Sequence, residues 1–356
     1  MNLYHSKLWM SDLDETIAAL PELAELEGRS VMITGCSGLI CSAVIDVLIR
    51  RNETHSGQIH IIAAGRNLLR IAERFSPFSS KGYFSAFEYD ATRENDFCYS
   101  CDYIIHGASN ASPNKIIREP VETMVGNFMG MKHLPDYAIQ QKIRRVLYIS
   151  TSEVYGHKLH DRPSREGEYG GIDLLNPRSS YSIGKCAAET LCASYADEYG
   201  VDSVIIRPGH IYGPTAVRSD NRVSSAWAYM VADGKDIVMK SDGSQIRSYC
   251  YCLDSASAIL KALLEGEATH AYNISNPDSI ISIREMAEIL TRSAGVALKT
   301  EAPTESEKRG FNPMRDSSLD STELHALGWK GLFDARRGFS HTVEILKEIS
   351  ADADAI

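Results

Sequence analysis

Short apolar stretches alternate with longer amphipathic ones over the first part of the chain. Runs rich in apolar and β-branched residues occupy positions 31–34, 58–64, 84–89, 102–106 and 145–149. Between them, positions 43–48, a segment around Leu69 and positions 121–140 carry apolar residues at the spacing of one helix face. Strands that alternate with helices form βαβ units, whose strands are parallel and whose helices cover both faces of the sheet. The pattern therefore predicts an α/β fold with a Rossmann-type doubly wound parallel sheet.

The pattern becomes irregular from about Arg207 onward, where RPGHIYGP brings prolines and glycines together. We expect an N-terminal extension over 1–28, a mainly dinucleotide-binding domain over 29–206, and a smaller α+β substrate lobe over 207–356. The two lobes should be interleaved, because no low-complexity linker separates them. The acidic extension would cap the sheet or a partner subunit.

The composition of the chain limits the kinds of molecule that we expect it to bind. The chain has 356 residues and a net charge of -10, and its basic residues form no dense cluster, so we expect no nucleic-acid partner. A few arginines in a pocket could still bind a small anion. The N-terminus lacks the apolar core of a signal peptide and no segment reaches membrane length, so we expect no membrane partner and a cytoplasmic location.

The eight cysteines fit reduced thiols of a cytoplasmic protein. Cys98 and Cys101 have the spacing of redox and metal sites, but no second pair accompanies them. We expect plain structural cysteines there and no metal.

A glycine turn follows the first strand, in the sequence TGCSGLI. Gly35 would permit a tight turn, Gly38 would let the backbone approach a pyrophosphate, and the N-terminus of the next helix would offer free N–H groups. The third small position is Cys41, where glycine is usual. The turn predicts a dinucleotide site.

The ends of the next strands offer further contacts for a dinucleotide. Arg66 and Asn67 follow the second strand, where an acid would bond the ribose 2′-hydroxyl of NAD and where Arg66 could instead pair with the 2′-phosphate of NADP. Asp90 and Ala91 follow the third strand, near the expected adenine. Ala108 and Ser109 follow the fourth, and their small side chains would let the backbone lie against the cofactor.

Tyr181 and Lys185 are four residues apart, so on a helix they share one face. The lysine charge would lower the cost of forming a tyrosinate, and Thr151, at the end of the fifth strand, could bond the same substrate oxygen. Together they would move the proton when an alcohol is oxidised while hydride passes to a nicotinamide.

Several motifs in this order resemble the extended short-chain dehydrogenase/reductase family of nucleotide-sugar epimerases, 4,6-dehydratases and decarboxylases. The similarity runs from about Arg29 onward and rests on TGCSGLI, HGASNASP, GNFMGMKHL, ISTSEVYG, YSIGK, RPGHIYGP, DGSQIRSYCYCLD and YNISNP. Cys41, Arg66 and His210 depart from the family pattern, which often has asparagine at the last position. The resemblance implies an NAD-dependent enzyme with a nucleotide-diphosphate sugar as substrate. It also implies a homodimer formed through the helices that contain Tyr181 and positions 121–140.

The resemblance also assigns binding residues. It gives the cofactor Gly35, Ser37, Gly38, Leu39, Ile40, Lys185 and Pro208, in addition to the strand-end residues above. Arg222 and Arg247 match positions that contact the nucleotide diphosphate, and a guanidinium suits phosphate oxygens. His210 belongs to the same substrate set, and Arg178 could face a charged substituent of the sugar.

Ser152 and Glu153 decide among the reactions of the family. Glu153 could abstract the C5 proton of a 4-keto sugar, as a 4,6-dehydratase requires. The dTDP-glucose dehydratases carry an aspartate where Ser152 stands, and a serine would not repel a C6 carboxylate. This stretch, with PRSSYSIGK and SDNRVSSAW, is most similar to the UDP-glucuronate decarboxylases.

Alternatives stay open at this stage. GDP-mannose 4,6-dehydratases also use a Thr-Ser-Glu pattern, so a 4,6-dehydratase or a 4-epimerase acting on another nucleotide sugar is the second reading. A dinucleotide-sensing protein without catalysis is the third, and it would not need Thr151, Glu153, Tyr181 and Lys185 together.

Overall fold

A computed structural model of the chain describes residues 2–97, 99–302 and 314–354. Its large sheet has seven strands in the order β10-β6-β5-β4-β1-β2-β3. Every neighbouring pair is parallel. The strands are β1 (Ser30–Thr34), β2 (His60–Gly65), β3 (Phe84–Glu88), β4 (Tyr103–His106), β5 (Arg145–Ile149), β6 (Ser203–Pro208) and β10 (Ala271–Ile274). The predicted doubly wound α/β fold is therefore confirmed.

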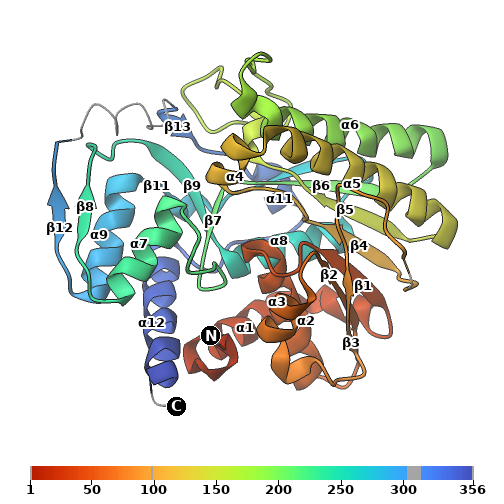
Figure 1. Cartoon of the computed structure of the whole chain (residues 1–356), viewed down its shortest axis with the longest axis horizontal. Coiled ribbons are helices and arrows are strands. Elements are labelled where there is room, and N and C mark those ends of the chain that lie inside the picture. Colours follow the sequence, from red (N-terminus) through yellow and green to blue (C-terminus); the bar gives the residue numbers. More distant parts are fainter. Residues whose placement is uncertain (1, 98, 303–313, 355–356) are drawn as a thin grey trace.

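Helices cover both faces of this sheet (Figure 1). On one face lie α2 (Leu39–Thr54) and α8 (Cys252–Glu265), and on the other α5 (Pro120–Gln141) and α6 (Ser180–Tyr199). Successive residues of β1 point to opposite faces, so Val31 and Ile33 pack with α2 and α8 while Met32 packs with α5. Both faces are buried, which is why the strands are continuous apolar runs. The short helices α3 (Leu68–Arg74) and α4 (Pro113–Arg118) follow β2 and β4.

The smaller lobe is built around β9 (Ile246–Tyr251), which pairs with β7 (His210–Tyr212), β11 (Ile280–Ser282) and β13 (Asp316–Ser317). A separate pair joins β8 (Ile237–Met239) to β12 (Leu298–Thr300). Among the residues that the structure describes after β6, the α-helices besides α8 are α7 (Val223–Ala232), α9 (Ile283–Ala294), α11 (Thr322–Ala326) and α12 (Ala335–Asp354). This mixture of strands and helices agrees with the expected α+β lobe. Because β10 and α8 come from beyond residue 207 and complete the large sheet layer, the two lobes share chain segments.

Three strands of the structure begin or end at other residues than the sequence predicted. β2 begins at His60 and β4 at Tyr103, each a little later than expected, and β3 ends at Glu88. Asp102 lies just before β4, and its carboxylate accepts a hydrogen bond from the Ser30 amide at 2.9 Å. The sequence analysis did not predict β6 or β10, which have the lengths of β2 and β4.

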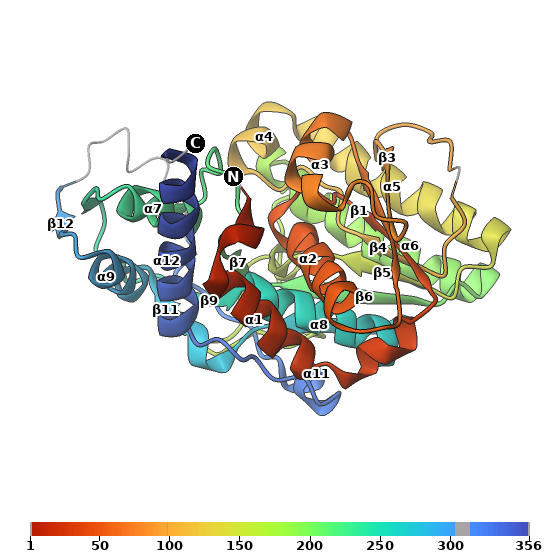
Figure 2. The ribbon, with the colours of Figure 1, turned by 90° about the horizontal axis from the view of Figure 1, so that it is seen from below.

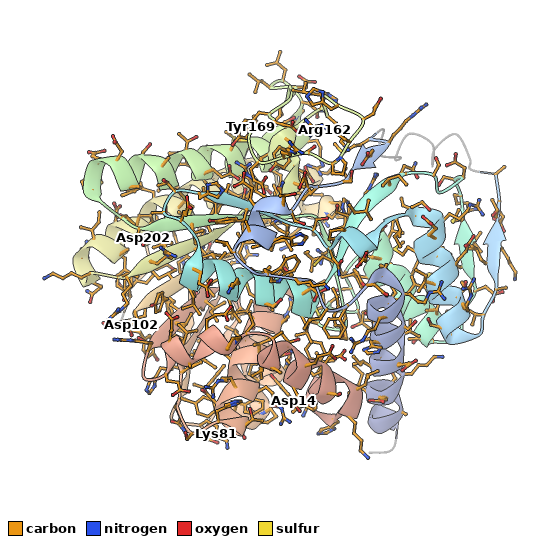
Figure 3. The ribbon with its side chains drawn as sticks, turned by 180° about the vertical axis from the view of Figure 1, so that it is seen from behind. Asp14, Lys81, Asp102, Arg162, Tyr169 and Asp202 are labelled. Atoms are coloured by element: carbon orange, nitrogen blue, oxygen red, sulfur yellow. The ribbon has the colours of Figure 1, made fainter. Side chains whose placement is uncertain are left out.

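The amino and carboxyl ends of the strands face different surroundings. At the amino ends, Arg145 and Asp202 form a two-pronged ion pair with distances of 2.9 Å. Figure 3 places Asp102 and Asp202 at the edge of the molecule away from the smaller lobe, while Arg162 and Tyr169 lie on the loop between β5 and α6. The carboxyl ends of the strands therefore face the smaller lobe.

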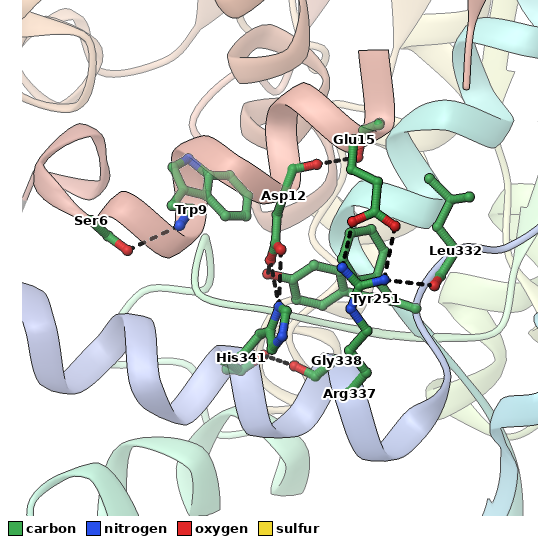
Figure 4. A network of polar contacts seen from close by, with 12 residues as sticks. Ser6, Trp9, Asp12, Glu15, Tyr251, Leu332, Arg337, Gly338 and His341 are labelled. Atoms are coloured by element: carbon green, nitrogen blue, oxygen red, sulfur yellow. Dashed lines mark hydrogen bonds and ion pairs between the residues drawn. The ribbon is translucent and has the colours of Figure 1, made fainter. Parts of the chain in front are cut away.

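The N-terminal extension is packed into the molecule. Its helix α1 (Lys7–Ala18) lies beside α8 and α12 (Figure 2). Asp12, which is 1% exposed, accepts a hydrogen bond from the Tyr251 hydroxyl at 3.1 Å and lies 2.9 Å from Nδ1 of His341 on α12. Glu15 pairs with Arg337 in the same network (Figure 4). The extension thus joins the large sheet layer to the last helix of the chain.

Candidate active site

The turn after β1 is shaped for close contact with a ligand. Gly35 has a φ of 71°, a conformation that favours glycine, and a Cβ there would lie 2.7 Å from the carbonyl oxygen of Gly107. Gly38 precedes the first residue of α2, so the free N–H groups of that helix point out of the turn. Ser37 lies in the same turn, and Leu39 and Ile40 are the first two residues of α2.

Cys41 occupies the third small position of the turn without a clash. Its side chain is buried at 3% exposure and lies against Gly107, at the carboxyl end of β4. A Cβ on Gly107 would lie 2.3 Å from the Cys41 sulfur. The glycine that the motif lacks on the helix is therefore supplied on the facing strand end.

The other predicted cofactor residues lie at the carboxyl ends of β2, β3, β4 and β6. Arg66 is exposed and donates to Oδ1 of Asn110 at 3.3 Å, and Asn67 uses its side chain to cap α3. Although burial opposes it, hydrogen bonds from Thr92 and the positive charge of Arg66 hold the pKa of Asp90 below its usual value. The same carboxyl edge of the sheet also carries Ala91, Ala108, Ser109 and Pro208, of which Ala91 and Pro208 are buried. The structure thus brings the predicted cofactor residues together along the carboxyl edge of the large sheet.

Thr151 and Tyr181 meet beyond the end of β5. Thr151 directly precedes the short helix η4 (Ser152–Tyr155), and Tyr181 lies in the first turn of α6. Burial raises the pKa of Tyr181 to about 12, and the negative charge of Glu153 adds to the rise. A hydrogen bond with Thr151 and the charges of Arg222 and Arg178 act in the opposite direction. The phenol therefore needs further positive charge before it can act as a base near neutral pH.

Lys185 is held close to Tyr181 by two contacts. Its ammonium donates to the carbonyl oxygen of Ile149 at 2.6 Å and lies 4.6 Å from the centre of the Tyr148 ring. It is 6.0 Å from the centre of the Tyr181 ring. Burial lowers the pKa of Lys185 to about 7, although the charge of Glu189 opposes the shift. The sequence analysis missed Tyr148, because an aromatic residue in a buried strand carries no local signal of a contact with a lysine.

Glu153 and Arg178 form a two-pronged ion pair. Nη1 and Nη2 of Arg178 donate to the two carboxylate oxygens at 2.9 and 2.8 Å. Glu153 lies in η4 after Ser152, and Arg178 lies in η5 (Pro177–Ser179), directly before α6. Each side chain is 38% exposed, so a substrate could reach both. We predicted separate roles for these two residues, and the structure brings them together.

Three predicted substrate residues gather where the smaller lobe meets the sheet. Burial lowers the pKa of His210 to about 3, and the positive charges of Arg247 and Arg222 add to the effect. Arg247 is 4% exposed and donates to the main-chain oxygens of Ile246 and Met314 at 2.8 and 3.0 Å. Arg222 pairs with Asp220, a partner that the sequence analysis missed. His210 is therefore neutral and Arg222 is paired with a carboxylate, so Arg247 supplies the positive charge that could attract a diphosphate.

Comparison with known proteins identifies the family. Residues 31–275 match the model of the NAD dependent epimerase/dehydratase family. The chain belongs to this family. The family resemblance seen in the sequence motifs is thereby confirmed.

Relatives within the family act on nucleotide sugars by name. UDP-glucuronic acid decarboxylase 6 of Arabidopsis thaliana is 28% identical over 310 residues, which cover 86% of each chain. A UDP-glucose 4-epimerase of Thermotoga maritima, solved with UDP-glucose, superimposes with a TM-score of 0.76 and 22% identity and covers 90% of this chain and 99% of its own. A dTDP-glucose 4,6-dehydratase of Streptomyces venezuelae, solved with NAD, superimposes with a TM-score of 0.75 and 21% identity. It covers 90% of this chain and 98% of its own. At these identities the two structures support the fold.

The described residues offer neither a metal cluster nor a membrane-spanning helix. Within the described residues, no three His, Cys, Asp or Glu side chains are grouped so that they could hold a metal ion. Cys98 of the predicted structural pair lies outside those residues, and Cys101 is a buried free thiol. Over the same part of the chain, no helix has the length and apolar character that crossing a bilayer requires.

Proposed function

We propose that the protein converts a nucleotide-diphosphate sugar through an intermediate with a ketone at sugar carbon 4, and that decarboxylation of UDP-glucuronate is the reaction that fits best. The observation that carries the proposal is the meeting of Thr151, Tyr181 and Lys185 beside the Glu153–Arg178 pair. The names of the curated relatives support the substrate class.

A nicotinamide dinucleotide fits the carboxyl edge of the sheet. Gly35 lets the turn pack directly against the backbone of Gly107 and Ala108, and the hydroxyl of Ser109 is buried there without a hydrogen-bond partner among the described residues. The residues that would hold NAD are those of the turn and strand ends, together with Lys185 and Pro208. When bound, the nicotinamide supplies a hydride acceptor that can later return the hydride.

The residues of this chain would handle the protons. Tyr181 accepts the proton of the sugar 4-hydroxyl, Thr151 hydrogen-bonds the same oxygen, and the Lys185 charge stabilises the tyrosinate. The resulting 4-ketone is β to the C6 carboxylate. It takes up the electron pair of the breaking C5–C6 bond as an enolate while carbon dioxide leaves. A proton then returns to C5, so no separate acid for a leaving hydroxyl is needed.

The Glu153–Arg178 pair favours a substrate that carries its own carboxylate. The guanidinium is reachable and is already arranged for a carboxylate, so the C6 group of a uronic acid could replace or share Glu153 as its partner. Ser152 adds no negative charge at this place. A 4,6-dehydratase is the second candidate, because Glu153 could abstract the C5 proton once it is released from Arg178.

The product mass distinguishes the candidate reactions. Purified protein is incubated separately with UDP-glucuronate, UDP-glucose, dTDP-glucose and GDP-mannose, and the nucleotide sugars are analysed by mass spectrometry. Loss of carbon dioxide from UDP-glucuronate supports the proposal. Loss of water from a neutral sugar identifies a dehydratase, and an isomer of unchanged mass identifies an epimerase. Absence of turnover with bound dinucleotide would favour the sensing protein.

The role of Tyr181 has its own test. Tyr181→Phe should abolish turnover and leave dinucleotide binding intact, because only the phenolic oxygen is removed. Tyr199→Phe is a matched control, since Tyr199 lies at the far end of the same helix and is 56% exposed. Activity of Tyr181→Phe close to that of the control would contradict the assignment of the base.

We also propose that two copies pair through α5 and α6. Val121, Met124, Val125 and Phe128 repeat at one helix face of α5 and are 40 to 67% exposed, although they are apolar. Phe128→Glu should convert a dimer to a monomer in light scattering after gel filtration. Leu159→Glu, at an apolar residue that is 59% exposed on a loop, should leave the dimer intact. A monomeric wild-type protein would refute the pairing.

Finally, we propose that the protein acts in the cytoplasm. Among the described residues every cysteine is a free thiol, and most of them are buried. Reduced thiols of this kind are typical of a reducing compartment.

A further inference from the structure

A buried ion pair joins α6 to β6. Arg207 on β6 is 2% exposed, and Glu189 on α6 is 9% exposed. Nε and Nη2 of Arg207 donate to the two carboxylate oxygens of Glu189 at 3.0 and 2.6 Å. Replacing a buried pair of this kind by apolar side chains is often neutral or stabilising, because burying two charges costs hydration energy. The free energy of folding by itself therefore gives little reason for the pair.

The remaining donors of Arg207 bind the segment that follows β5. Nη1 donates to the Tyr155 hydroxyl at 3.0 Å and to the main-chain oxygen of Glu166 at 2.6 Å, and Nη2 donates to the Tyr169 hydroxyl at 2.6 Å. Together with the two bonds to Glu189, these contacts give all five N–H groups of the guanidinium an acceptor. Arg207 is thus a fixed junction between β6, α6 and the segment after β5.

Tyr155 is the last residue of η4 and is held by two strands of the large sheet. Its hydroxyl accepts from Arg207 and donates to Oδ1 of Asn273 on β10 at 2.6 Å. Arg207 and Asn273 are register partners in the sheet, so their side chains lie on the same face and contact this hydroxyl together. The tyrosine is 4% exposed, and its ring centre lies 5.1 Å from the Arg207 guanidinium carbon. The carboxyl end of η4 is therefore fixed to the sheet.

The same short helix holds two residues of the candidate active site. Thr151 is the N-cap of η4, and its hydroxyl accepts a hydrogen bond from the Glu153 amide at 3.3 Å. Glu153 lies two residues before Tyr155 and pairs with Arg178. Because η4 has only four residues, a displacement of Tyr155 would move Thr151 and Glu153 as well. A shift of about 1 Å in a reacting group can lower a rate about a hundredfold.

We propose that Arg207 is a positioning residue of the proposed reaction, which fixes η4 through Tyr155. Thr151 and Glu153 are thereby held toward the substrate. Glu189 neutralises the charge that this role requires in the interior. The inference rests on the proposed function, because it assumes that Thr151 and Glu153 act on a nucleotide sugar.

Two conservative substitutions test the positioning role. Tyr155→Phe and Tyr169→Phe each remove one hydroxyl that accepts from Arg207. Only Tyr155 belongs to η4, whereas Tyr169 lies on the loop after it and is 55% exposed (Figure 3). The substrate is UDP-glucuronate, UDP-glucose, dTDP-glucose or GDP-mannose, whichever the wild-type protein converts. Tyr155→Phe should lower kcat about tenfold, as expected for the loss of one hydrogen bond with a charged group, and leave KM within about twofold. Tyr169→Phe should change neither by more than about twofold.

A double variant tests whether Arg207 acts through Tyr155. Arg207→Lys keeps a positive charge opposite Glu189, but it offers three N–H donors instead of five and lacks the planar fork. It should lower kcat about tenfold by itself. Arg207→Lys combined with Tyr155→Phe should lower kcat no further than either single change, because both break the same link. Calorimetric titration with NAD⁺ should give dissociation constants within about twofold of wild type for all variants, which shows that the dinucleotide domain is folded.

Three outcomes would overturn the positioning role. The first is equal kcat in Tyr155→Phe and Tyr169→Phe, and the second is a multiplied loss of about a hundredfold in the double variant. The third is a loss of NAD⁺ affinity in parallel with kcat, since that would indicate a general weakening of the fold. In all three cases, turnover by the wild-type protein leaves the proposed function standing. Absence of turnover of all four sugars by the wild-type protein would overturn the positioning role and the proposed function together.

Discussion

Gly107→Ala adds a single methyl group where α2 meets the end of β4, and it should be costly. The new Cβ would lie 2.3 Å from the sulfur of Cys41 and 3.1 Å from Cδ1 of Ile149. Favourable contacts between heavy atoms require about 3.5 to 4.0 Å, so helix and strand end must separate by roughly 1 Å or the cysteine must leave its position. Cys41 is buried, so it has no free space to enter.

The expected magnitude follows from this overlap. Overpacking by one methylene costs typically about 1–3 kcal/mol, and we expect a loss near the top of that range in the free energy of unfolding. Cys41→Ala alone removes one buried atom and should cost about 1 kcal/mol. Cys41→Ala combined with Gly107→Ala removes the atom that clashes, so the double variant should be about as stable as Cys41→Ala, with a coupling energy of about 2–3 kcal/mol.

Urea unfolding measured by tryptophan fluorescence and by far-UV circular dichroism gives these free energies when the two transitions coincide. Gly82→Ala is the matched control, because a Cβ at Gly82 meets no atom within 4 Å. Dinucleotide affinity should fall with Gly107→Ala as well, since the carbonyl of Gly107 lies directly against the turn at Gly35.

The explanation of Cys41 fails if Gly107→Ala is as stable as Gly82→Ala. It fails equally if the double variant is no more stable than Gly107→Ala, because the two positions would then be independent.

Three further substitutions test the interior of the site and the N-terminal helix. Burial lowers the pKa of Lys185 to about 7, below its value of about 10.4 in an unfolded chain, so the unfolded state binds more protons between these values and stability rises with pH across that window. Lys185→Met should remove this increment, and a stability difference from wild type that does not change with pH would contradict the lowered pKa. Asp12→Ala removes the acceptor of the Tyr251 hydroxyl and should lower the free energy of unfolding in urea by about 1–3 kcal/mol. Asp14→Ala, which breaks an exposed ion pair with Arg50, should lower it by less than about 1 kcal/mol. Equal losses would refute a stabilising role of the buried Asp12–Tyr251 hydrogen bond. Glu153→Gln should stop a dehydratase but only slow a decarboxylase, and the masses of the products distinguish the two. Full activity of the variant on every sugar would contradict a catalytic role for Glu153.

Local spacing was enough to predict much of the fold and the relative position of two candidate site residues. The runs at 31–34 and 145–149 became β1 and β5, and the glycine turn between β1 and α2 formed as expected. Tyr181 and Lys185 lie on one face of α6 because four residues make about one helical turn. These features depend on backbone geometry over a few residues, which the sequence displays directly.

Contacts between distant segments could not be predicted in this way. Glu153 and Arg178 were assigned separate roles, although they form one ion pair between η4 and η5. The sequence analysis did not predict β6 and β10, although they are as long as β2 and β4, and only their parallel pairing places residues 271–274 in the large sheet.

The sequence by itself determined the doubly wound sheet, the glycine turn after β1 and the order along the chain of the residues that we propose to be catalytic. The tertiary structure decided which distant residues these segments contact. Cys41 departs from the motif in the sequence, but only the packing of α2 against the end of β4 shows that Gly107 makes room for it. Asp12 and His341 are 329 positions apart, and no local pattern relates them. Helix and strand periods repeat within a few residues, whereas such pairings depend on how whole layers pack.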